Sequence, residues 1–244
     1  MGILNTLIQR TSSLDKSVIL PESNDPRIIE AAVLLVEKSV AKPVLCGIPE
    51  EIMAAFEKCG KSCSGINIVD INDTELINEF AFLYQKQRPN VSEKVALRLV
   101  KKPLIFGGMM VASGRVDAMV AGAASTTADV IQAAALTAGY QKNISKASSF
   151  FIMEMPDSKI YFFADCAVNI SPDSETLADI GIATASSFKK LMNEKPLVAF
   201  LSFSSKGSAS HPDVEKVVKA VEIAKDKDPE TAYDGEFQVD TAVS

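Results

Sequence analysis

Three polar loops each follow directly on an apolar run, and they hold most of the side chains that could do chemistry. The first is GAASTT at residues 122–127, which has one glycine and three hydroxyl groups and precedes a predicted helix. Free backbone N–H groups and the positive end of a helix dipole suit such a turn to an anion. Under this interpretation Ser125, Thr126 and Thr127 bind substrate. The alternative is that Ser125 or Thr126 simply caps the helix.

The second polar loop, SFSSKGSAS at residues 202–210, carries five hydroxyl groups, one glycine and one lysine. These groups could hold a phosphate or the pyrophosphate of an acyl carrier. The spacing is not that of a P-loop, so no nucleotide site of that kind is predicted. The alternative is an ordinary polar loop. The candidate binding residues are Ser204, Ser205, Lys206, Gly207 and Ser208.

Acidic residues form two further candidates. Asp165 lies in ADCAVN, directly after an apolar run, and could be a catalytic acid or a hydrogen-bonded cap of the next turn. The last residues, DGEFQVDTAVS at 234–244, place acids in alternation with Phe237 and Val239. A period of two predicts a strand with one buried side and one side facing a cleft.

The remaining reactive residues exclude several kinds of site. The chain has four cysteines and a single histidine, His211, so we expect no metal site. We expect the cysteines to be reduced and structural. A lone histidine also removes most Ser-His and Cys-His nucleophile schemes. Because His211 precedes Pro212 and a predicted helix, we expect it in a loop or capping role.

The composition limits the class of protein. Hydrophobic residues make up 47% of the 244 residues and charged residues 23%, which is typical of a globular chain. The net charge of −6 argues against binding to nucleic acid, which needs clustered lysine and arginine. The apolar stretches are too short to span a bilayer, and there is no signal peptide pattern. We therefore expect a cytoplasmic protein without a membrane partner.

The elements that must position the loops alternate between strand and helix in the first half. Apolar runs at 17–20, 43–46, 66–69 and 117–120 are separated by helical patterns, which predicts a mainly parallel sheet with helices on both faces. Loops after such strands meet at one edge, where ligands bind.

The alternation of strand and helix gives way to two consecutive β-rich runs near residue 147. We therefore predict a domain boundary at this point, with domains at 1–147 and 148–244. Two β-rich runs joined by Pro156-Asp157-Ser158 predict a hairpin. A long helix from Ser174, a strand and another helix from Pro212 follow. The fold class predicted for the whole chain is α/β.

Five stretches carry a resemblance to a known family, in this order along the chain: LPESNDPR (20–27), VDAMVAGAASTTADV (116–130), FFADCAVN (162–169), SFSSKGSA (202–209) and DGEFQVDTA (234–242). Together they resemble the phosphate acetyltransferase (phosphotransacetylase) family, close to the phosphate butyryltransferases. The resemblance implies two α/β domains with mainly parallel sheets and a cleft between them. It implies conversion of acetyl-CoA plus phosphate into acetyl phosphate plus CoA, with acetyl-CoA or another acyl-CoA as substrate and no tightly bound cofactor.

The chain departs from the family pattern in two places. The family continues beyond the DGEFQVD stretch with a Ser-Arg pair and an aspartate, its main catalytic groups, so the resemblance assigns no catalytic residue here. The expectation is an incomplete second domain, little or no acyl transfer by these residues alone, and a terminal strand that is uncovered or paired in a homo-oligomer. In the helix after residue 127, a threonine and an arginine that face the phosphate in much of the family correspond to Val130 and Gln132. Under this resemblance Gln132 and Asp165 are further substrate-binding residues. Gln132 lacks the charge of a guanidinium. Lys86 or Arg88 could stand in for another family arginine.

A second hypothesis belongs to a different class. The chain could be a non-catalytic module of the same fold that serves subunit association or effector binding. The neutral Gln132 and the missing Ser-Arg segment favour this alternative, whereas the intact SFSSKGSA and DGEFQVD stretches favour the acyltransferase.

Overall fold

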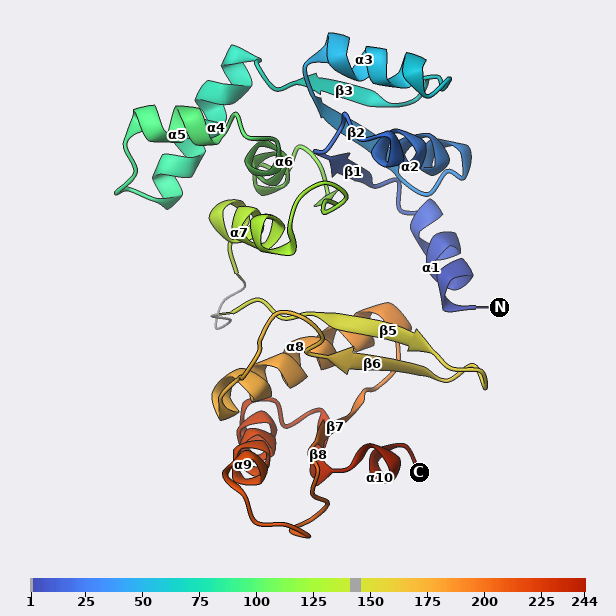
Figure 1. Cartoon of the computed structure of the whole chain (residues 1–244), viewed down its shortest axis with the longest axis vertical. Helices are drawn as coiled ribbons and strands as arrows, with labels where there is room; N and C mark the ends of the chain where they lie inside the picture. The colour runs from blue at the N-terminus through green and yellow to red at the C-terminus, as the bar shows by residue number, and fades with distance from the viewer. Residues whose placement is uncertain (1, 141–145) are drawn as a thin grey trace. The chain divides into compact units, whose positions relative to one another are not determined.

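The computed structural model describes residues 2–140 and 146–244, which fall into two units. The first unit holds residues 4–140, and the second holds residues 146–244 together with residues 2 and 3. Each unit combines strands with helices (Figure 1). The predicted α/β class is therefore confirmed. The domain boundary after residue 147 stays a prediction.

The described strands of the first unit form one sheet in which neighbours run parallel. The strands are β1 (Ser17–Leu20), β2 (Lys42–Gly47), β3 (Asn67–Asp70) and β4 (Ala118–Met119). Their order is β3-β2-β1-β4, so β1 is paired on both sides. Its Ile19 lies opposite Val44 of β2 and Met119 of β4. The mainly parallel sheet predicted from the alternation is confirmed.

Helices cover both faces of this sheet because its strands bury side chains in both directions. Ile19 and Val44 pack in one core cluster with α4 and α6, whereas Leu20 and Leu45, the next residues, pack in another with α2 and α3. Proline or a side-chain cap begins most of these helices, namely α2, α3, α4, α6 and α7. The helices of this unit are α1 (Ile3–Ser12, apart from its first residue), α2 (Pro26–Glu37), α3 (Pro49–Lys58), α4 (Thr74–Gln87), α5 (Glu93–Leu99), α6 (Pro103–Ala112) and α7 (Thr127–Thr137).

Helix α6 is apolar all round and packs closely against α7. Gly108 lies so near Thr137 that an added Cβ would fall 2.2 Å from the Thr137 hydroxyl oxygen. Both residues are buried, and Thr137 is 1% exposed. The glycine therefore permits the close approach that brings α7, and the loop before it, to the edge of the sheet.

The second unit contains a hairpin and a parallel pair of strands. The strands β5 (Phe150–Glu154) and β6 (Ile160–Ala164) are antiparallel, which confirms the predicted hairpin. The strands β7 (Leu197–Leu201) and β8 (Ala232–Phe237) are parallel. The helices are α8 (Ser174–Met192), α9 (Pro212–Lys227) and α10 (Val239–Val243).

Helices α8 and α9 supply most of the core of this second unit. Phe200 of β7 and Tyr233 of β8 are buried in a cluster with Ala178, Ala220 and Val221. The long helix begins as predicted, because the Asp173 carboxylate accepts a hydrogen bond from the Thr176 backbone N–H at 2.8 Å. His211 has the predicted capping role at α9, where its Nδ1 accepts from the Asp213 backbone N–H at 3.1 Å.

The prediction of one strand along the last acidic stretch is wrong beyond Phe237. Strand β8 ends there, and Val239 and Asp240 belong to helix α10. Glu236 is 2% exposed, so its carboxyl group does not lie on an open strand face. The alternation fails because Gly235 has φ +147° and the register with β7 shifts at this point. Strand β8 is paired with β7 through Phe237, opposite Leu201.

Candidate functional site

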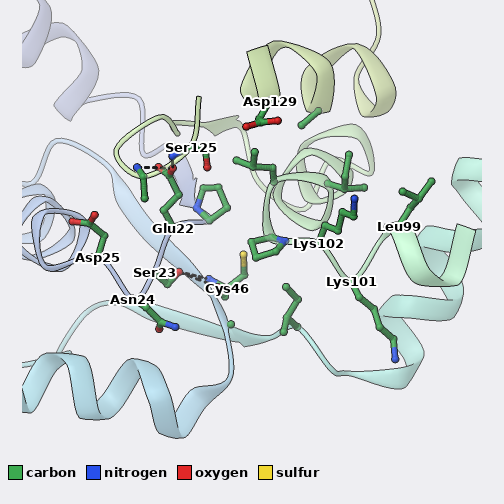
Figure 2. Close-up of a pocket in the computed structure, with 18 of the residues that line it drawn as sticks. Glu22, Ser23, Asn24, Asp25, Cys46, Leu99, Lys101, Lys102, Ser125 and Asp129 are labelled. Carbon is green, nitrogen blue, oxygen red and sulfur yellow. Dashed lines mark hydrogen bonds between the residues drawn. The ribbon is translucent and has the colours of Figure 1, made fainter. Parts of the chain in front are cut away.

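A pocket of about 760 Å³ lies in the first unit, at the carboxyl edge of its sheet (Figure 2). Residues that follow β1, β2 and β3 line it, together with the loop before α7 and the start of α6. This is where open parallel sheets bind ligands. Its polar lining residues include Glu22, Ser23, Asn24, Asp25, Glu51, Lys101, Lys102, Ser125, Asp129 and Gln132.

The first predicted loop bends around the carboxylate of Glu22. One oxygen of Glu22 accepts hydrogen bonds from the backbone N–H groups of Gly122 and Ala123, both at 2.8 Å. The other accepts from Ala124 at 2.9 Å and from Ser125 at 2.6 Å. We call these N–H groups of residues 122–125 the anion nest. It is the kind of site that the sequence predicts for an anion, and the protein's own carboxylate occupies it.

The charge of Glu22 is held by these bonds. Partial burial by itself raises the pKa of the carboxyl group, but hydrogen bonds from the Ser125 side chain and from the backbone of residues 122–124 outweigh burial and lower it from 4.5 to about 2. Glu22 is therefore ionised at neutral pH. The backbone N–H groups of the loop before α7 therefore bond to a negative charge of the protein itself.

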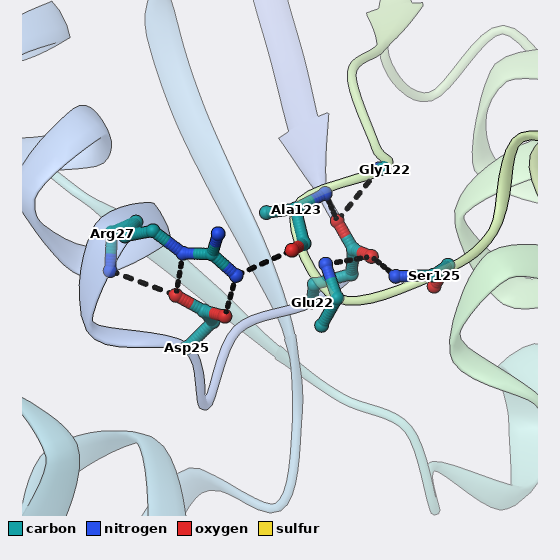
Figure 3. A network of polar contacts seen from close by, with 7 residues as sticks. Glu22, Asp25, Arg27, Gly122, Ala123 and Ser125 are labelled. Atoms are coloured by element: carbon teal, nitrogen blue, oxygen red, sulfur yellow. Dashed lines mark hydrogen bonds and ion pairs between the residues drawn. The ribbon is translucent and has the colours of Figure 1, made fainter.

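Arg27 holds the same loop from its other side (Figure 3). The guanidinium of Arg27 bonds to both carboxylate oxygens of Asp25, at 2.9 and 2.6 Å, and also donates to the carbonyl oxygen of Ala123. Asp25 in turn caps α2 by accepting from the Arg27 backbone N–H. The LPESNDPR stretch therefore provides both a carboxylate and a guanidinium that hold the loop.

The predicted residues at the start of α7 divide into two groups. Thr126 caps the helix: its Oγ1 accepts from the Asp129 N–H at 3.2 Å and lies 2.7 Å from the Asp129 carboxylate. The capping alternative is confirmed for Thr126. Among the described residues, Ser125 and Gln132 line the pocket, whereas Thr126 and Thr127 do not.

Two lysines of the pocket were not predicted. Lys101 and Lys102 precede α6, with Lys102 at its N-cap, and their side chains extend in different directions in Figure 2. Both residues are exposed. The signal that could have found them is the adjacent pair of cations before Pro103 in a chain with net charge −6.

Cys46 lies in the wall of this pocket but is not a nucleophile. Burial raises the pKa of its thiol to about 12, so the thiol stays protonated at neutral pH. Its backbone N–H donates to the Ser23 hydroxyl at 3.0 Å. This bond ties the end of β2 to the turn after β1.

Arg88, one of two proposed substitutes for a family arginine, is engaged elsewhere. Its guanidinium donates to the carbonyl oxygens of Ala135 at 2.7 Å and Leu136 at 3.2 Å, near the end of α7. It also lies over the Tyr84 ring, 5.6 Å from the centroid. Neither Arg88 nor Lys86 is among the described residues that line the pocket.

The second predicted loop, after β7, is held by Glu236. Its Oε1 accepts from the Gly207 backbone N–H at 2.7 Å and from the Ser204 hydroxyl at 3.0 Å. Ser204 is fully buried, and its oxygen accepts from the Ala209 N–H at 3.1 Å. The Ser208 hydroxyl accepts from the Ser205 N–H at 3.0 Å. Several of the predicted donors thus bond within the loop and to its neighbouring strand.

Lys206 extends from this loop into an ion pair. Its ammonium group lies 2.6 Å from a carboxylate oxygen of Asp234 and 2.9 Å from the Gly235 carbonyl oxygen. It is also 4.9 Å from the centroid of the Phe237 ring. About half of each charged side chain is exposed, so an anion can still approach the ammonium group.

Asp165 organises its own turn. Its carboxylate accepts from the backbone N–H groups of Ala167, Val168 and Asn169, and from the Ser149 hydroxyl at 2.6 Å. Burial opposes ionisation, but these bonds hold the pKa of Asp165 well below its ordinary value. The carboxylate acts as a hydrogen-bonded cap, which was the alternative to a catalytic acid.

No group of three or more His, Cys, Asp or Glu side chains in residues 2–140 and 146–244 could hold a metal ion. No helix in the same residues is both long and apolar enough to cross a membrane.

Known proteins resemble this chain over its whole length. The family model described as phosphate acetyl/butaryl transferase matches residues 2–244. Phosphate acetyltransferase from Thermoanaerobacterium thermosaccharolyticum is 39% identical, over 100% of this chain and 76% of its own. The Bacillus subtilis enzyme of the same name is 36% identical, over 98% of this chain and 74% of its own.

Solved structures agree with the sequence comparison. The EutD phosphotransacetylase from Staphylococcus aureus superposes with a TM-score of 0.91 at 33% identity, covering 98% of this chain and 74% of the other. A phosphotransacetylase from Streptococcus pyogenes superposes with a TM-score of 0.88 at 31% identity, covering 99% of this chain and 75% of the other.

Proposed function

This chain belongs to the phosphate acetyl/butaryl transferase family, and we propose that it transfers an acetyl group between coenzyme A and inorganic phosphate. The observation that carries this proposal is the similarity to phosphate acetyltransferases along the whole chain, in sequence and in fold. Acetyl-CoA and phosphate are the substrates in one direction, and acetyl phosphate and CoA in the other. CoA is consumed as a substrate and is not a resident cofactor.

The reaction sets three requirements for the protein. A phosphate oxygen attacks the thioester carbonyl, a C–O bond forms, the C–S bond breaks, and CoA leaves as the thiolate. The protein must therefore bind anionic groups, place the two substrates together and stabilise negative charge on the carbonyl oxygen. Hydroxyl, amide and ammonium donors are the groups that can do so.

Within the first unit, we propose that substrate contacts come from the pocket. Ser125 supplies a hydroxyl group and Gln132 an amide, and Lys102 supplies a positive charge at the same pocket. Thr126 and Thr127 stay candidates for substrate contacts at the start of α7, where Thr126 is also the helix cap. Because Gln132 is neutral, its bonds to phosphate are weaker than those of a guanidinium.

Within the second unit, we propose that the loop 204–208 binds an anionic part of the substrates. Lys206 is its only cation and is half exposed, which supports this role. Ser205, Gly207 and Ser208 are the loop's further candidate donors, whereas Ser204 and Asp165 are committed to structural bonds. We also propose that the protein is cytoplasmic and forms a homo-oligomer.

The test is an assay of acetyl-CoA formation from acetyl phosphate and CoA, with butyryl phosphate as a second acyl donor. We expect thioester and free phosphate to appear in equal amounts, faster than without protein. The size of the rate tests the separate prediction that these residues alone give little acyl transfer. Calorimetry with CoA separates the alternative function: binding of CoA with no product from either donor would favour a non-catalytic module.

A further inference from the structure

The anion nest of residues 122–125 is complete without a ligand. Its successive backbone N–H groups converge on one point, and the loop leads into the eleven-residue helix α7. In other proteins such a turn binds phosphate. Here each of the N–H groups donates to Glu22, so a phosphate ion could enter only by displacing that carboxylate.

Strand order explains why Glu22 reaches this loop. Strands β1 and β4 are parallel neighbours, with Ile19 opposite Met119, so the segments that follow them leave the sheet at the same edge. Glu22 follows the end of β1 and the nest follows the end of β4. Figure 3 shows the carboxylate inside the curve of the loop, with Arg27 bonded to the Ala123 carbonyl from outside.

We propose that Glu22 is a positioning residue that fills the anion nest in place of phosphate and thereby fixes Ser125 in the wall of the pocket. The nest is then a structural device, and substrate phosphate binds to side-chain donors of the pocket rather than to the nest. The kinetic consequence rests on the proposed function, whereas occupancy of the nest does not.

The first test is by NMR of the backbone amides of residues 122–125. In the unaltered protein we expect these signals not to move when formate, a small carboxylate, is added. In Glu22→Ala they should shift, and saturating formate should return them toward their original positions. Glu30→Gln, which removes an exposed carboxylate from α2, is the matched control and should leave them unchanged. Amide signals of residues 122–125 that shift neither with Glu22→Ala nor with formate would overturn the proposal.

The second test is kinetic. Because phosphate contacts depend on the position of Ser125, Glu22→Ala should lower kcat/KM for phosphate about tenfold or more, mainly through KM, with partial recovery in formate. Glu22→Gln, which keeps the shape of the side chain but offers one acceptor oxygen, should also be impaired and should not recover with formate. Wild-type kinetics in both variants would contradict the positioning role.

The two tests separate two kinds of failure. If the unaltered protein shows no acyl transfer while the amide signals respond as expected, the proposed function fails and nest occupancy stands. If acyl transfer is present and the amide signals do not respond, the inference about Glu22 fails alone. Circular dichroism of each variant shows whether it is folded. If Glu22→Ala is not folded, Glu22→Gln is used in its place.

Discussion

The Oε1 atom of Glu236 lies 2.7 Å from the backbone nitrogen of Gly207, so a residue of β8 holds the loop that follows β7. Glu22 stands in the same relation to Gly122 in the first unit, at 2.8 Å. In both units a glutamate carried on or just after one parallel strand holds the loop that follows the neighbouring strand. Both loops were candidates for binding substrate anions, and both hold an internal carboxylate.

Replacing Glu236 with alanine should destabilise the second unit. The Gly207 N–H and the buried Ser204 hydroxyl would lose their acceptor, which costs about 1–3 kcal/mol for a buried polar group. Urea unfolding followed by circular dichroism measures the loss. Glu230→Ala, at an exposed position, is the control and should change little. Equal stability of the two variants would mean that the Glu236 contacts contribute nothing.

The stability contributed by Glu22 should depend on pH in the acid range. Its pKa is about 2 in the folded protein against an ordinary 4.5, so the unfolded state binds more protons between these values. The contribution is therefore fully present above 4.5 and is lost as the pH falls toward 2. Thermal unfolding of the wild type and Glu22→Gln from neutral pH downward should show the two Tm values converging. A constant difference in Tm would contradict the depressed pKa.

Gly108→Ala should destabilise the first unit through its contact with Thr137. The new Cβ would lie 2.2 Å from the Thr137 hydroxyl oxygen, and overpacking of this kind costs about 1–3 kcal/mol. A double-mutant cycle with Thr137→Ala tests the cause. The double variant should lose less stability than the sum of the single variants, since Thr137→Ala removes the Oγ1 atom, which is the nearest contact of the new Cβ, and of these Thr137 atoms leaves only the Cβ at 2.9 Å. Additive losses would place the strain elsewhere.

Gln132→Arg should strengthen phosphate binding under the proposed function. A guanidinium can bond to phosphate through two charge-assisted hydrogen bonds, whereas the amide offers neutral ones. We expect KM for phosphate to fall several-fold with little change in KM for acetyl-CoA. Gln132→Met is the uncharged comparison and should raise KM for phosphate. An unchanged KM in both variants would remove Gln132 from the phosphate site.

Lys206→Ala should raise KM for the substrate whose anionic part it contacts and should lessen the dependence of KM on salt, since salt screens an exposed charge. Two variants separate this role from the ion pair with Asp234. Asp234→Asn breaks the pair but keeps the ammonium group, so it should not raise KM. Lys219→Ala removes an exposed lysine of α9 and should behave as wild type. The same salt dependence in Lys206→Ala and wild type would leave Lys206 with only its structural contacts.

The sequence by itself determined most of the elements of this protein. Apolar or β-rich runs marked every strand of the two units except β8, and the capping roles of Thr126 and His211 were among the alternatives that the sequence offered. These features are local, because a cap bonds to N–H groups two or three residues away and strand periodicity reflects burial of adjacent side chains. The resemblance to the acyltransferase family rests on the same local stretches, and the family match confirms it.

Only the tertiary structure decided which of these stretches are partners. LPESNDPR and GAASTT each stand out in the sequence, but Glu22 meets Gly122 across 100 residues because β4 pairs with β1 on the side opposite β2. Lys101 and Lys102 reach the pocket for a similarly non-local reason, because residues that follow β1, β2 and β3 line it with them. The order of the strands decides which N–H donors lie near a given carboxylate at the edge of the sheet. The spacing of residues along the chain does not determine the order of the strands.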